Sequence, residues 1–88
     1  VDSLGWVHFK LGDPQKAVAY LERATELEPS DPEITGHLGD VYWVLGRYDE
    51  ARFKWRLALS LSADEEERAM LSARLKDGLA AKDVPVAN

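Results

Sequence analysis

The sequence predicts an all-α protein made of two antiparallel helix hairpins and a closing helix. Three observations predict this fold class. The chain resembles itself at an interval of 34 residues. Glycines and prolines separate segments whose apolar residues recur at helical spacing. No segment alternates apolar and polar residues in the manner of a half-buried strand.

Small and apolar residues carry the 34-residue repeat. The identical pairs are Leu4/Leu38, Gly5/Gly39, Val7/Val41, Leu11/Leu45, Gly12/Gly46, Ala17/Ala51, Ala24/Ala58 and Leu27/Leu61. A period of this length is typical of stacked supersecondary units. Gly39 falls inside an expected helix, where glycine costs about 1 kcal/mol relative to alanine. That cost indicates that a neighbouring helix, carrying small residues such as Ala51, packs close to the backbone there.

Turn and cap residues set the expected boundaries of the helices. Asp13-Pro14 and Asp31-Pro32 are typical of an N-cap followed by a first-turn proline. Gly46 suits the left-handed residue that ends a helix. We therefore expect helices at 1–11, 14–28, 32–45, 48–61 and 64–80. Because the joins are short, sequential helices should lie antiparallel.

The two units read "SLGWVHFKLGDPQKAVAYLERATELEP" and "HLGDVYWVLGRYDEARFKWRLAL". Their order of Leu-Gly, aromatic, Gly, Ala, bulky residue and Ala resembles the tetratricopeptide repeat over residues 1–63. The resemblance implies hairpins stacked with a right-handed twist. Three departures are visible: the first unit lacks its opening residues, His8 replaces an aromatic residue, and Ala63 stands where proline is usual.

The resemblance also divides the chain. The expected domain covers 1–81, with repeat 1 at 1–31, repeat 2 at 32–63 and a closing helix at 64–81, followed by a loose tail at 82–88. The wording of the second unit is similar to the C-terminal end of long repeat proteins from proteobacteria. Since Val1 already lies in a helical pattern, we expect a C-terminal fragment of a longer bacterial protein.

The last expected helix departs from the repeat. Four carboxylates at 64–67 occupy its first turn, where the helix dipole favours negative charge. Leu71, Leu75 and Leu79 form an apolar stripe behind them. Because the 34-residue register places no Leu-Gly pair there, this helix is expected to cap the open face of the second unit.

Composition argues against several functions. The net charge of −5 disfavours nucleic acid and anionic membranes, and no apolar run reaches the length of a membrane span. His37 and Asp40 could offer two metal ligands, but zinc takes three or four, and the chain has no cysteine. The acidic run at 64–67 lacks the alternating pattern of a calcium loop. We therefore expect no enzyme activity, no cofactor and no metal.

The resemblance implies a concave groove, lined by the first helix of each unit, that binds a peptide or a partner helix. Helical spacing independently places Asp2, Trp6 and Phe9 on one face. For Trp6 and Trp43, ligand contact and packing are equal alternatives; for Phe9 packing is slightly favoured, and Trp55 is expected in the core. The expected groove residues are Asp2, Trp6, Phe9, Lys10, Glu33, Gly36, His37, Asp40, Trp43 and Val44, with Ser3 on the border.

These residues give a partly apolar strip with acidic flanks, which suits a protein partner with apolar anchors and some positive charge. A clamp for a partner's terminal carboxylate is not expected, because Asp2 and Asp40 would repel it. The predicted function is a protein-interaction scaffold; the alternative is a purely structural cap of a longer superhelix. The isolated chain is expected to self-associate through its N-terminal edge, at Val1, Leu4, His8 and Leu11. Bacterial cytoplasm, periplasm and outer-membrane attachment are all compatible with the sequence.

Overall fold

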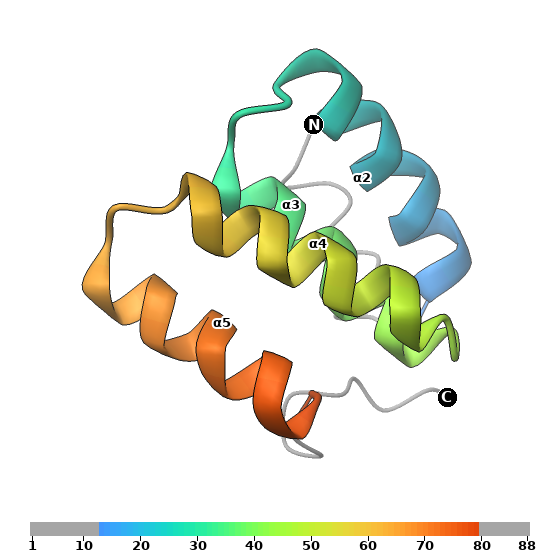
Figure 1. Cartoon of the computed structure of the whole chain (residues 1–88). Coiled ribbons are helices and arrows are strands. Elements are labelled where there is room, and N and C mark those ends of the chain that lie inside the picture. Colours follow the sequence, from blue (N-terminus) through green and yellow to red (C-terminus); the bar gives the residue numbers. More distant parts are fainter. Residues whose placement is uncertain (1–12, 80–88) are drawn as a thin grey trace.

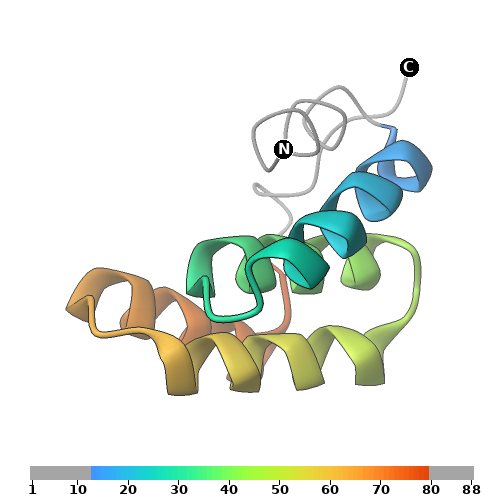
Figure 2. The ribbon, with the colours of Figure 1, turned by 90° about the horizontal axis from the view of Figure 1, so that it is seen from above.

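The computed structural model describes residues 13–79, and every regular element in that range is a helix. The helices are α2 (Pro14–Leu27), α3 (Pro32–Val44), α4 (Tyr48–Leu61) and α5 (Glu65–Asp77). In Figures 1 and 2, the α3–α4 hairpin lies between α2 on one side and α5 on the other. The all-α prediction is confirmed for this part of the chain. The predicted helix at 1–11 and the tail at 82–88 lie outside the described residues.

Local capping explains where the helices begin and end. The Asp31 carboxylate accepts hydrogen bonds from the backbone N–H groups of Glu33 (2.9 Å) and Ile34 (3.2 Å) at the start of α3. Asp64 caps α5 in the same way, at 3.0 Å from the N–H of Glu66. Gly46, at φ +81°, ends the turn after α3 in a conformation that favours glycine. The ends of α2, α3 and α4 agree with the sequence expectation to within one residue. Helix α5 ends at Asp77 and not at residue 80 as expected, because Gly78, at φ +79°, terminates it.

The core forms where bulky side chains of one helix meet small residues of another. Trp55 is completely buried, as are Leu21 and Leu38. A Cβ atom added at Gly39 would lie 2.6 Å from the Trp55 indole and 3.1 Å from the Ala51 carbonyl oxygen. No real Cβ atom tolerates the shorter distance, so the glycine is required for α3 and α4 to nest. The close approach expected at Gly39 is confirmed.

Helix α5 covers the side of the α3–α4 hairpin that faces away from α2. Leu71 is fully buried, and its Cδ2 atom would lie 3.4 Å from a Cβ atom added at Gly36. Leu75 is partly buried and Leu79 is 8% exposed. The apolar stripe expected in this segment is therefore the side that packs inward. Its burial leaves the acidic first turn of α5 at the surface, beside the start of α3.

Candidate interaction groove

A hollow of about 350 Å³ lies between the beginnings of α3 and α5. We call it the α3–α5 groove. Three of the groove residues expected from sequence, Glu33, Gly36 and His37, line it together. The remaining lining residues are Pro32, Asp64, Glu66, Glu67, Met70 and Leu71.

The floor of the groove is apolar. Leu71 lies beside Gly36, with its Cδ2 atom 3.4 Å from the position that a Cβ atom would take there. Met70 lies one residue earlier on α5 and is 39% exposed, so part of its thioether side chain is open to solvent. Methionine adapts its shape to an incoming side chain more readily than branched residues do. The floor can therefore accept an apolar anchor.

The rim of the groove is acidic. Glu33 stands at the start of α3, and Glu66 and Glu67 stand at the start of α5. Glu67 also accepts a hydrogen bond from the Ser62 hydroxyl, which holds its carboxylate at the edge. No lysine or arginine is among the lining residues. The groove therefore presents negative charge around an apolar floor and favours a cationic ligand.

Asp40 differs from the sequence expectation, because it is only 1% exposed and does not line the groove. Its Oδ1 atom accepts a hydrogen bond from the Trp55 indole N–H at 2.9 Å. Its Oδ2 atom lies 3.2 Å from the Arg74 guanidinium, which comes from α5. A buried carboxylate requires such compensation. Asp40 thus joins α3, α4 and α5 instead of meeting a partner.

Trp43 also packs against neighbouring side chains but is only partly buried, so its contact with a ligand stays a prediction. Its ring centroid lies 4.4 Å from that of Tyr48 and 5.5 Å from that of Trp55. The Arg52 guanidinium lies 5.0 Å from the Trp43 ring centroid, and Gly78 lies against the indole. Val44 is partly buried against the same core. Neither residue is among those that line the groove.

The other expected groove residues, Asp2, Ser3, Trp6, Phe9 and Lys10, lie outside the described residues. Their part in a binding surface stays a prediction.

A family model described as "Tetratricopeptide repeat" matches residues 3–66, which is most of the chain. The chain belongs to the tetratricopeptide repeat family. Repeats of this family generally mediate protein–protein interactions, and the family is typically a non-enzymatic scaffold. None of the curated protein sequences compared with the chain matches it.

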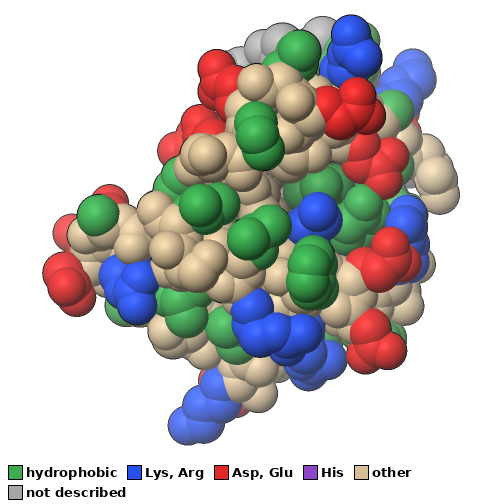
Figure 3. Space-filling view, turned by 45° about the horizontal axis from the view of Figure 1, so that its top comes forward, with side chains coloured by type: hydrophobic (Ala, Val, Ile, Leu, Met, Phe, Trp, Pro, Cys, Tyr) green, Lys and Arg blue, Asp and Glu red, His purple; other side chains and the backbone are tan. Residues whose placement is uncertain are grey.

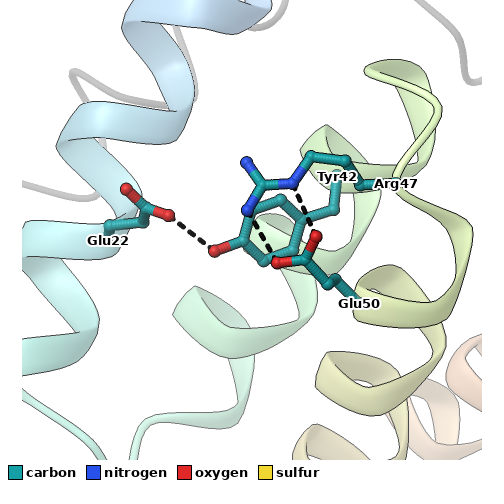
Figure 4. Close-up of polar contacts among 4 residues, drawn as sticks. All are labelled: Glu22, Tyr42, Arg47 and Glu50. Atoms are coloured by element: carbon teal, nitrogen blue, oxygen red, sulfur yellow. Dashed lines mark hydrogen bonds and ion pairs between the residues drawn. The ribbon is translucent and has the colours of Figure 1, made fainter.

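The tetratricopeptide units are joined by a polar network that the sequence analysis missed (Figure 4). Tyr42 of α3 donates a hydrogen bond to Glu22 of α2 at 2.6 Å. The Arg47 guanidinium lies 4.3 Å from the Tyr42 ring centroid and binds both Glu50 oxygens, at 2.7 and 2.6 Å. Burial raises the pKa of the Tyr42 hydroxyl far above its usual range, and the hydrogen bond to Glu22 adds to it. The hydrogen bond with Arg47 lowers the pKa of Glu50.

Six lining residues of the groove were also missed: Pro32, Asp64, Glu66, Glu67, Met70 and Leu71. The 34-residue period of the sequence could have identified three of them. Adding the 34-residue period to Glu33, Gly36 and His37 gives Glu67, Met70 and Leu71. Helix α5 therefore occupies the place of a further first helix in the tetratricopeptide stack, although it lacks the Leu-Gly pair.

Among residues 13–79, no three His, Asp or Glu side chains are grouped so that they could hold a metal ion. None of the four described helices has the length and apolar character needed to cross a bilayer.

Proposed function

We propose that the chain is a protein-interaction module whose α3–α5 groove binds a segment of a partner protein. The observation that carries the proposal is the hollow itself, which combines an apolar floor at Met70 and Leu71 with an acidic rim. An extended peptide or the side of a helix would place one apolar side chain on this floor. Lysine or arginine residues on either side of that anchor would face Glu33 and Glu66.

The second candidate is a structural role, in which α5 closes the end of a longer stack. The buried Leu71 and the Asp40–Arg74 pair favour it, because both fix α5 on the preceding hairpin. The two roles use different parts of α5: closure depends on its buried side, and binding depends on its exposed first turn. They can therefore be separated by changes confined to that first turn.

The charge pattern of the groove gives a matched pair of variants. Glu66 lines the groove, whereas its neighbour Glu65 does not. Both are exposed in the first turn of α5, so reversing either charge disturbs the helix dipole to a similar extent. The probe is a synthetic peptide with one central leucine between lysines, titrated into the isotope-labelled chain at physiological salt and followed by NMR. We expect amide shifts centred on Glu33, His37 and Met70.

Glu66→Lys should weaken the binding of this peptide by about tenfold, because one reversed charge in direct contact changes the binding energy by about 1.4 kcal/mol. Glu65→Lys should change it by less than about twofold, since Glu65 does not line the groove and salt screens interactions between exposed charges over a Debye length of roughly 8 Å. A peptide with glutamates in place of the lysines should not bind. Equal effects of the two variants, or no shifts at the groove, would refute binding at this site and leave the structural role.

A further inference from the structure

Helix α4 has an outward side that no described element covers. Phe53 is 56% exposed on this side, while Trp55, two residues later, is completely buried. Leu57 follows Phe53 by one turn and is also exposed. Figure 3 shows hydrophobic side chains spread over the face that α2 and α4 form, with acidic and basic side chains around them. Phe53 and Leu57 together form an exposed apolar strip along this side of α4.

Opposite charges flank Phe53 along the same side of α4. Asp49 precedes it and Arg56 follows it, and both are exposed. They are seven residues apart, which is two helical turns, so both side chains point in nearly the same direction. Neither takes part in an ion pair within the described part of the chain. The helix thus carries a negative group, an aromatic ring and a positive group in a row.

We propose that this side of α4 binds a second copy of the chain, with the two α4 helices antiparallel about a two-fold axis near Phe53. In such an isologous pair, the same surface must be complementary to itself. Reversing the direction of one helix brings Asp49 of each copy opposite Arg56 of the other. The two Phe53 rings meet at the axis between these ion pairs. The order of Asp49, Phe53 and Arg56 along α4 makes this surface complementary to itself. A helix with charges of one sign on both sides of the ring would repel its copy.

A hollow beside the ring fits the same occupant. Its volume is about 400 Å³, and Phe53 and Lys54 of α4 and Tyr42 of α3 line it together with Asp49 and Glu50. The Lys54 ammonium lies 5.6 Å from the centroid of the Phe53 ring. An aromatic side chain entering from the other copy would find an aromatic wall and a cation, both of which bind aromatic rings favourably. The exposed Phe53 ring and this hollow lie side by side on α4. In a two-fold pair, each copy can therefore offer its ring to the hollow of the other.

The contact is small. One side of a single helix buries on the order of a few hundred Å² per copy, below the roughly 800 Å² of a standard stable interface. We therefore expect a weak dimer that forms as the protein concentration rises. The surface shares no residue with the lining of the α3–α5 groove. Dimer formation and peptide binding are thus independent properties.

Charge reversal tests the proposed pairing. Sedimentation equilibrium of the full 88-residue chain, over a range of concentrations and at low salt, should show a monomer–dimer equilibrium. In the proposed dimer, Asp49→Arg makes two arginines face each other at each of the two former ion pairs. Arg56→Asp makes two aspartates face each other at the same places. Each single variant should weaken the dimer by at least about tenfold, because like charges that face each other are strongly unfavourable. The double variant should recover most of the loss, since the pair is restored with its signs exchanged.

A second variant guards against loss of folding. Phe53→Glu lies at an exposed position and should leave the helical circular dichroism unchanged, while two carboxylates at the axis prevent the dimer from forming. A monomer at every concentration would overturn the proposal. So would a double variant that associates no better than the single ones. If none of the three substitutions weakened the dimer, the proposal would also be wrong, and self-association would use another surface, such as the N-terminal edge.

Discussion

Replacing Trp55 by alanine is expected to remove roughly 3–5 kcal/mol of folding free energy, the range for large aromatic residues in a core. The side chain is completely buried and fills the space that Gly39 leaves open. Its indole N–H also donates to Asp40, so the substitution takes a hydrogen bond from a buried carboxylate. Single domains have total stabilities of about 5–15 kcal/mol. The variant should therefore be largely unfolded at moderate temperature.

Phe53→Ala is the matched control, because it removes an aromatic ring from the same helix at an exposed position. Urea titrations followed by circular dichroism at low protein concentration should show a change below about 1 kcal/mol for this variant. If the two variants lost similar amounts of stability, Trp55 would not be the centre of the core.

Replacing Arg74 by methionine is expected to reduce the free energy of unfolding by about 3 kcal/mol. The substitution keeps an unbranched apolar stem but removes a positive charge 3.2 Å from a carboxylate that is 1% exposed. Loss of one partner of a buried ion pair typically costs about 3–5 kcal/mol, and the low value applies because Arg74 is partly open to solvent at 13%. The measurement is chemical denaturation.

Lys76→Met is the matched control for Arg74, since Lys76 is exposed on the same helix and should change stability by less than about 0.5 kcal/mol. The double variant Asp40→Asn with Arg74→Met should regain part of the loss, because the buried charge is then absent. A double variant whose loss equals the sum of the two single losses would show that the pair is not coupled.

The parts of the fold that were predictable depend on local chemistry. Asp31-Pro32 and Gly46 mark helix ends through hydrogen bonds and backbone angles within a few residues, so the sequence is enough to place them. Gly39 was predictable for a different reason. A glycine inside a helix is unfavourable unless something needs the space, and its recurrence at the repeat period identified a packing contact.

The candidate site was only partly predictable, because helical spacing identifies a face but not what covers it. Asp40 and Trp43 lie on α3 at the spacing expected for the inner face. The structure shows that Arg74 and Gly78, in and just after α5, cover them. A capping helix was expected in that segment, but without a Leu-Gly pair its register does not indicate which residues of α3 it covers. Glu33 and His37 keep exposed surface at the groove because they lie beside the exposed first turn of α5, and Gly36 lies buried between them.

The nesting of α3 against α4 positions everything else, including the α3–α5 groove. Two glycines of α3 test this nesting, because adding a Cβ atom should be unfavourable at one of them and tolerated at the other. A Cβ atom at Gly39 would lie 2.6 Å from Trp55, whereas at Gly36 its nearest neighbour would be 3.4 Å away, an ordinary contact with the end of Leu71.

The most direct measurement is therefore the free energy of unfolding of Gly39→Ala and Gly36→Ala, compared side by side. Overpacking should make Gly39→Ala less stable than the parent chain by about 1–3 kcal/mol. Gly36→Ala should be as stable as the parent or more stable by up to about 1 kcal/mol, because alanine favours the helix. A Gly39→Ala variant as stable as Gly36→Ala would contradict the nested packing.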